Sequence, residues 1–101
     1  MSLKVISETL SADGSSAVLD WDGRFVGHFA AHGTFGSGTA TLEYSLDDGS
    51  NYFSVDSTNL AYTEDGQGNF ELPKCKLRVT VSGSISPTIA VTVIPIAAIS
   101  Q

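Results

Sequence analysis

The sequence predicts an all-β fold, a single small antiparallel β-sandwich of the jelly-roll or immunoglobulin-like kind with about seven to nine short strands. Three observations lead to this prediction. Several short stretches alternate between apolar and polar residues, and clusters of turn-forming residues recur about every 8 to 12 positions. No window places apolar residues at i, i+3, i+4 and i+7 over three turns, so no long helix is expected. With 101 residues, the chain 1–101 is expected to form one domain.

The composition agrees with this fold and limits the partners. Apolar residues make up 42% of the chain and charged residues 16%, with 10 glycines, a balance that suits strands and tight turns better than helices. The formal charge is −6, from 11 acidic and 5 basic residues. Nucleic acid is therefore not expected as a partner, because phosphate binding needs a basic surface. A basic surface on another protein would be compatible with this charge.

The single cysteine and the lack of long apolar runs indicate where the protein works. One cysteine, Cys75, cannot form an intrachain disulfide, which favours assembly in the cytosol. The start of the sequence holds no apolar signal segment, and no apolar run approaches the roughly 18 residues that span a bilayer. We therefore expect a protein that is made and used in solution, with no membrane partner.

The first third of the chain predicts a strand, a loop and a hairpin. Residues 3–9 form a plausible first strand, in which Leu3 and Val5 alternate with Lys4 and Ile6, and the turn formers of residues 11–16 follow as a loop. Two apolar runs, at residues 17–21 and 24–31, flank the dipeptide Asp22-Gly23. A two-residue Asp-Gly connection is a strong hairpin signal, because a type I′ turn needs positive φ at both positions. These two runs are therefore expected to pair antiparallel.

The central stretch, residues 39–55, predicts the hairpin around which the chain is organised. Three glycines in residues 32–38 precede it, and they permit bends or a close approach of two backbones. In the first arm the residue types alternate, which indicates a strand with one face in the core and one in water. The expected inward residues are Ala40, Leu42 and Tyr44, and the expected outward residues are Thr41, Glu43 and Ser45. Residues 47–51 form the turn, and residues 52–55 begin the returning arm.

The last part of the chain predicts further short strands. Residues 56–59 read as a polar break, residues 60–63 as a short strand or an extended link, and residues 64–69 as a turn before an extended segment at 70–72. Residues 76–82 then show the cleanest alternation in the sequence. Its expected inward residues are Leu77, Val79 and Val81.

The final strand is predicted at residues 88–96, after a turn at residues 83–87. Ile89, Val91 and Val93 share one face of this strand, and both faces are apolar toward its end. A strand with two apolar faces is expected to be central in a sandwich or covered by a neighbouring molecule.

The tip of the central hairpin resembles an Asp-box turn. Residues 45–52 read SLDDGSNY against the pattern S-x-D-x-G-x-T-W, with Asn51 and Tyr52 at the last two positions. In such a turn the Asp accepts backbone N–H bonds and the aromatic residue packs beneath it, so a structural role is expected. Alternatively, two groups of residues could supply oxygen ligands to a calcium ion, although their spacing matches no EF-hand loop. These groups are Asp20 with Asp22, and Asp47 with Asp48, Asn51 and Asp56.

No residue pattern indicates catalysis, and we expect neither an enzyme nor a bound metal or cofactor. His28 and His32 would share one face of a strand, but a zinc site needs further ligands. Cys75 has no local feature that would lower its pKa, so a buried structural role suits it better than a nucleophilic one. The acidic residues fall at turns or on solvent faces rather than in a pair across a cleft. The sequence contains no phosphate-binding loop and no HExxH motif.

Two groups of residues are candidates for binding a partner. Lys74, Lys76 and Arg78 are three of the five basic residues and would point the same way on an alternating strand. This basic stripe fits either an acidic partner surface or a charged edge that prevents aggregation. The second group is the apolar run at residues 94–99, which is expected to be buried against the core, a sister subunit or the surface of a larger shell. Its largest side chains are Ile94, Ile96 and Ile99.

Aromatic side chains leave one further alternative, a carbohydrate-binding β-sandwich. Tyr52, Phe53 and Trp21 would form a platform for sugar rings if they were exposed. Trp21 and Tyr44 occupy inward positions of their predicted strands, as core residues do.

The chain resembles small virion proteins of tailed bacteriophages. The likeness covers residues 21–96 and rests on three segments: GTFGSGTATLEYSLDDGSNY, a TxDGxGNFELP segment and KLRVTVSGSISPTIAVTVIPI. The residues that carry it are Gly33, Phe35, Gly36, Tyr44, Ser45, Asp47, Gly49, Tyr52, Leu72, Pro73, Arg78, Ser82 and Gly83.

This resemblance implies a structural role in a virion. Such proteins look like capsid decoration (cement) or head-associated proteins, which are often trimeric and bind the outer face of the assembled shell. The expected partners are the major capsid protein and further copies of the chain, as a homotrimer. The expected location is the capsid surface of the virion, after assembly in the host cytoplasm. A tail or neck adaptor is a second possibility, because such proteins share the same kind of β-sandwich.

Overall fold

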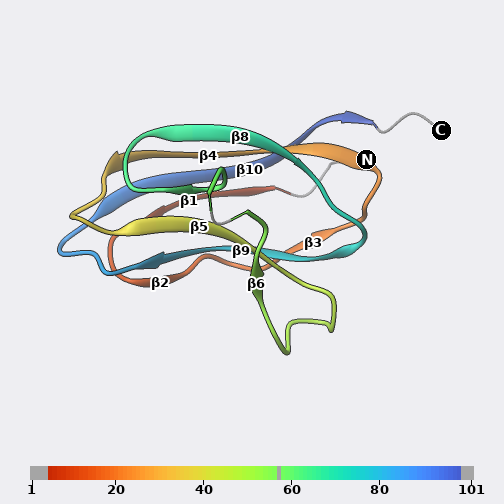
Figure 1. The fold of residues 1–101 in the computed structure, drawn as a ribbon, viewed down its shortest axis with the longest axis horizontal. Helices are drawn as coiled ribbons and strands as arrows, with labels where there is room; N and C mark the ends of the chain where they lie inside the picture. Colours follow the sequence, from red (N-terminus) through yellow and green to blue (C-terminus); the bar gives the residue numbers. More distant parts are fainter. Residues whose placement is uncertain (1–4, 57, 99–101) are drawn as a thin grey trace.

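The computed structural model describes residues 5–56 and 58–98 and arranges them as two antiparallel sheets packed face to face (Figure 1). Sheet A contains, in spatial order, β1 (Ile6–Leu10), β10 (Thr88–Ala98), β4 (Phe25–Thr34) and β8 (Gly66–Glu71). In sheet B the central strands are β9 (Cys75–Ser82) and β5 (Thr39–Ser45). The short strands β2 (Gly14–Ser15) and β3 (Leu19–Trp21) pair with β9, and β6 (Phe53–Ser54) and β7 (Ala61–Tyr62) pair with β5.

This arrangement confirms the predicted all-β sandwich. The described residues form ten strands rather than seven to nine, and three of these, β2, β6 and β7, are only two residues long. β10 lies between β1 and β4, as expected of a strand with two apolar faces. The described ranges contain no helix long and apolar enough to cross a membrane.

The core lies between the sheets, and strict alternation along the central strands builds it. In β9, Leu77, Val79 and Val81 are at most 1% exposed, as predicted. Opposite them, β10 contributes Ile89 and Val93, which are fully buried. Each buried aliphatic side chain of this size contributes about 1.5–3 kcal/mol by leaving water. The two central strands therefore hold the sheets together.

The predicted hairpin around Asp22-Gly23 is wrong, because the two flanking strands belong to different sheets. β3 pairs with β9 in sheet B, whereas β4 pairs with β10 and β8 in sheet A. Gly23 has a φ of 83°, but Asp22 is not among the residues with positive φ, so a type I′ turn does not form. Asp22 instead accepts the N–H of Arg24 at 2.9 Å. The dipeptide turns a corner between the sheets.

A second crossing packs against this corner. The chain passes from β8 back to sheet B through Pro73 and Lys74, and a Cβ on Gly23 would lie 2.6 Å from the Lys74 nitrogen. Only glycine fits there, because it has no side chain. Gly23 is therefore required by the close contact between two backbones, and not by a hairpin turn as the sequence suggested.

The glycine-rich segment before β5 makes the expected close backbone approach. Gly33 has a φ of 131°, and a Cβ there would lie 2.1 Å from the carbonyl oxygen of Thr88 on β10. The strand β4 nevertheless continues to Thr34, so the glycine does not end the pairing.

The predicted turn at residues 64–69 is wrong in its second half, where β8 begins at Gly66. Its glycines make room for an aromatic ring rather than for a turn. A Cβ on Gly66 would lie 2.6 Å from the ring of Tyr62, and one on Gly68 would lie 2.9 Å from its hydroxyl oxygen. Tyr62 in turn stacks on Phe29, with ring centroids 5.3 Å apart.

The first strand has the opposite phase to the one expected. Ile6 and Leu10 are buried, because they pair with the inward residues Val93 and Ile89 of β10 and paired residues share a face. Val5 is 49% exposed, and Leu3 lies outside the described residues. The predicted loop at residues 11–16 also contains β2, which is paired with β9.

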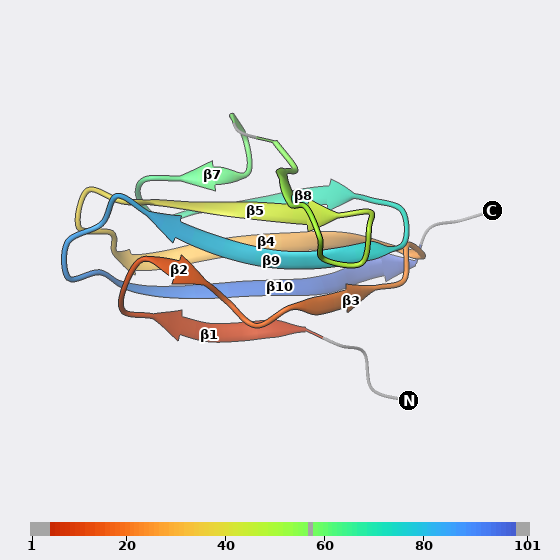
Figure 2. The same cartoon turned by 90° about the horizontal axis from the view of Figure 1, so that it is seen from below.

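Several segments converge at one end of the sandwich, which we call the terminal end. β10 finishes there, beside the corner between β3 and β4, whereas β1 begins farther back along the sheet, where Ile6 pairs with Val93 (Figure 2). Ala98 pairs with Phe25 at the start of β4, and Gly23 touches Lys74. We define the terminal end by Gly23, Phe25, Lys74 and residues 95–98.

Candidate functional site

The predicted basic stripe lies on the outer face of sheet B. Lys76 and Arg78 point outward from β9, between the buried residues Leu77 and Val79, while Lys74 precedes the strand. β9 lies between β5 and the pair β2 and β3, so the stripe does not guard a sheet edge. The charged groups of Lys76 and Arg78 contact other residues of the same chain.

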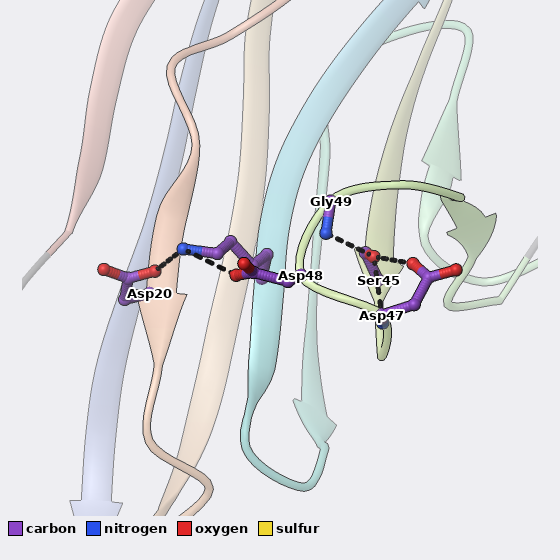
Figure 3. A network of polar contacts seen from close by, with 6 residues as sticks. Asp20, Ser45, Asp47, Asp48 and Gly49 are labelled. Atoms are coloured by element: carbon purple, nitrogen blue, oxygen red, sulfur yellow. Dashed lines mark hydrogen bonds and ion pairs between the residues drawn. The ribbon is translucent and has the colours of Figure 1, made fainter.

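Lys76 joins an edge strand to the hairpin tip. Its Nζ lies 2.5 Å from Oδ1 of Asp20 on β3 and 3.4 Å from Oδ1 of Asp48 in the turn after β5 (Figure 3). The hydrogen bond with Asp20 is the main cause that raises the pKa of Lys76, and Asp48 adds to it. Two carboxylates therefore surround this ammonium group.

Arg78 is also occupied within the chain. Its Nε donates to Oε1 of Glu43 on β5 at 2.8 Å, and Thr80 donates to the same oxygen at 2.6 Å. Its guanidinium carbon lies 3.8 Å above the ring of Tyr52, a cation–π contact. Lys76 and Arg78 thus form interactions between neighbouring segments of the chain rather than a free basic patch.

Lys74 is the member of the stripe that remains exposed, and it forms no ion pair with any described residue. It stands at the rim of a surface depression of about 510 Å³ beside the terminal end. Leu46, which is 64% exposed, contributes an apolar side chain to the same depression. The residues that line it are Asp20, Trp21, Ser45, Leu46, Asp48, Lys74, Cys75 and Lys76.

The hairpin tip is a tightly bonded turn, as the Asp-box likeness predicted. Asp47 accepts the backbone N–H of Asn51 at 2.9 Å and its side-chain amide at 2.7 Å. Ser45 donates to Asp47 at 2.6 Å (Figure 3). These bonds, from Ser45 first and then Asn51, lower the pKa of Asp47 to about 2. The aromatic residue of the motif, Tyr52, packs beneath Arg78.

Ser45 was predicted to face water from β5, but its side chain is buried. It is 1% exposed, because its hydroxyl group is the centre of the turn. Besides donating to Asp47, the Oγ accepts the N–H of Gly49 at 2.9 Å. A buried hydroxyl is tolerated where its hydrogen bonds are satisfied.

The surroundings of Cys75 and of the two histidines give no indication of a catalytic or metal site. Cys75 is buried, and desolvation raises the pKa of its thiol to about 11, which opposes formation of a thiolate nucleophile. His28 lies 2.7 Å from the Asn69 side chain and 3.1 Å from that of Gln67, while His32 is exposed. Among residues 5–56 and 58–98, no group of three or more His, Cys, Asp or Glu side chains is placed to hold a metal ion.

The three residues of the possible sugar platform do not form one surface. Trp21 is 4% exposed and packs on Phe70, with ring centroids 5.1 Å apart. Tyr52 lies under Arg78, and Phe53 is 61% exposed. Burial of Trp21 leaves a sugar ring without its largest stacking partner.

The apolar run at the C-terminal end of β10 is only partly covered. Ile94 is partly buried and Ile96 is 47% exposed, whereas Ile99 lies outside the described residues. The register between β10 and β4 shifts between Pro95 and Ala97, so Ile96 is the extra residue of a β-bulge. Ile96 is therefore not buried against the core of its own chain, which was one of the three expected outcomes.

Some stabilising hydrogen bonds were not predicted from the sequence, because the two residues that form them lie far apart in the chain. Asp13 accepts the N–H of Ser84 at 2.9 Å as well as its hydroxyl, and these bonds lower the pKa of Asp13. Asp13-Gly14 resembles any other loop dipeptide, and no local signal points to Ser84.

No family model and no curated protein matches this chain.

Proposed function

We propose that this chain is a non-enzymatic virion structural protein, a capsid decoration (cement) protein that binds the outer surface of a phage head and stabilises it. The major capsid protein is the proposed partner, and the capsid surface, after assembly in the host cytoplasm, is the proposed location. The proposal begins with the resemblance of residues 21–96 to small phage virion proteins. The arrangement of the terminal end supports it.

The observation that carries the proposal is the exposed apolar side chain of Ile96. Ile96 is 47% exposed on a bulge of β10, a strand that lies between β1 and β4 in sheet A. Bulges re-aim side chains and are common next to functional surfaces. Ile96 thus offers a small apolar contact at the end of a rigid body.

Lys74 gives this contact a charge preference. It is one of two exposed cations at the terminal end, with Arg24 between Gly23 and Phe25, on a chain whose formal charge is −6. An acidic group on the shell beside an apolar pocket would complement Lys74 and Ile96 together. Each such contact is small, and many copies on one shell would add their effects through the assembly.

The use of the ionisable side chains agrees with a structural role. Asp13, Asp47 and Asp56 each accept hydrogen bonds from loop backbones, and Lys76 and Arg78 join neighbouring segments. Such bonds hold loops in fixed positions, which suits a subunit that has to present a constant surface.

Adding the protein back to phage heads that lack it tests the proposal. The gene is deleted from the phage that encodes it, and heads are heated with and without the purified protein while DNA release is followed. We expect the protein to bind along the shell and to raise the release temperature. Ile96→Ser should weaken binding, whereas Ile85→Ser, at a side chain that is 78% exposed in the loop between β9 and β10, should not.

Two results would contradict the proposal. One is unchanged head stability with no protein on the shell. The other is a copy number that matches a single ring at the neck or tail, which would favour the adaptor function instead.

A further inference from the structure

The outer face of sheet A is almost free of charged side chains. Its four strands contain two, Glu8 and Glu71. Glu8 has the same strand phase as the inward residues Ile6 and Leu10, and its carboxylate accepts the N–H of Ala17 at 2.8 Å. Glu71 is the last residue of the edge strand β8. The middle of the face therefore carries no acid, lysine or arginine.

Small polar and apolar residues occupy that middle instead. The register of the strands places Ser7, Thr92, Ala30 and Gln67 in one row across the sheet, and Ala90 beside His32 in the next. These residues face outward, because their neighbours Val91 and Ala31 are buried in the core. His28 lies within hydrogen-bond distance of Gln67 and Asn69, which orders the side chains along β4 and β8.

The outer face of sheet B, in contrast, carries charged side chains. There the central strands carry Glu43, Lys76 and Arg78, and Asp20 lies beside them on β3. Charged groups are stable in water and costly to desolvate. The two outer faces of this protein thus differ in the number of charged side chains that they carry. Exposure to water alone does not account for this difference, because both faces would then be expected to carry charges.

We propose that the outer face of sheet A is the contact between two copies of this chain, which pack sheet A against sheet A about a two-fold axis. The formal charge of −6 means that two copies repel each other at most orientations. Contact through sheet A brings the fewest charges together and desolvates almost none. Small side chains such as Ser7, Ala30 and Ala90 allow the sheets to approach to about 10 Å. A basic partner would instead prefer the acidic loops.

The size of the face sets the strength of the contact. The four strands have 5, 11, 10 and 6 residues. With about 3.3 Å per residue and about 4.8 Å between strands, the face covers about 500 Å² on each copy. A total near 1,000 Å² is close to the lower limit for a specific interface, so we expect a weak dimer that dissociates on dilution. The contact does not depend on any virion role.

A two-fold contact of this kind also determines the number of subunits. One surface patch that binds itself closes after two copies, so it cannot by itself produce the homotrimer expected from the resemblance. A mass of two chains is therefore the specific expectation.

Sedimentation equilibrium on the purified chain, from about 5 to 500 µM, tests the inference, since it spans the range expected for an interface of this size. The wild type should show a concentration-dependent mass that rises to two chains. Ala90→Glu places a carboxylate in the exposed middle of the face, and we expect its association constant to fall at least about tenfold through like-charge repulsion. Ser82→Glu adds the same charge to the outer side of sheet B, where Ser82 is also exposed, and should leave association unchanged.

Folding of each variant is checked by the fluorescence of the buried Trp21. If Ala90→Glu fails to fold, Ser7→Glu on the exposed edge strand β1 replaces it with the same expectation. A wild type that stays monomeric at 500 µM, a mass of three chains, or a dimer that a folded face variant leaves intact would each overturn the proposal.

Discussion

Nζ of Lys76 lies 2.5 Å from Oδ1 of Asp20, and this contact fastens the short strand β3 to the centre of sheet B. β3 has only three residues and pairs with β9 alone. The same ammonium group reaches Asp48 at 3.4 Å, so one side chain connects an edge strand, a central strand and the hairpin tip. A cation that looked like part of a docking stripe acts within the fold.

Replacing Lys76 should loosen β3 locally. In Lys76→Met the aliphatic stem is kept and the charge is lost, so we expect faster amide hydrogen exchange at residues 19–21. Exchange in β8, which belongs to the other sheet, should not change and serves as the internal control. Unaltered exchange in β3 would show that backbone pairing alone holds the strand.

Gly33 should be intolerant of any side chain. Gly33→Ala would put a Cβ 2.1 Å from the Thr88 carbonyl oxygen at a φ of 131°, and we expect it to lower the free energy of unfolding by at least about 3 kcal/mol. Gly83→Ala is the matched control, because Gly83 has a φ of 68° but no atom within 4 Å of the added Cβ. That variant should lose only about 1–2 kcal/mol. Urea denaturation measures both, and equal losses would contradict the close approach.

Acid should destabilise the hairpin tip in a defined pH range. The pKa of Asp47 is lowered from 3.8 to about 2, so its contribution to stability is complete above pH 3.8 and is lost as the pH falls toward 2. Asp47→Asn should therefore reduce stability near neutral pH and flatten the dependence of the urea midpoint on pH between 4 and 2. A wild-type midpoint that does not change over this range would refute the assignment.

Cys75 should resist alkylation in the folded protein. Burial raises the pKa of its thiol to about 11, so little thiolate is present at pH 8 and access is restricted. We expect iodoacetamide to label the native protein slowly and the urea-unfolded protein quickly, as followed by mass spectrometry. Rapid labelling of the native state would point to a reactive cysteine and away from a purely structural one.

Local patterns were sufficient where a residue's role depends on its near neighbours in the chain. The alternation in β9 identified Leu77, Val79 and Val81 as core residues, and the turn chemistry around Asp47 identified the hairpin tip. Burial of Trp21 and Cys75 also followed from inward positions and residue type. The site was predicted less completely, since the basic residues were recognised but their acidic partners on β3 and β5 were not.

The sequence by itself determined that this protein is a β-sandwich with a hairpin at residues 39–55 and two apolar central strands, because the alternation of side chains along a strand is written in consecutive residues. Only the tertiary structure decided that Asp22-Gly23 joins two sheets, that Lys76 and Arg78 are already paired, and that one outer face is almost uncharged. These properties depend on which strands lie side by side. Strand neighbours are chosen by packing across the whole chain, and residues near one another in sequence carry little information about that choice.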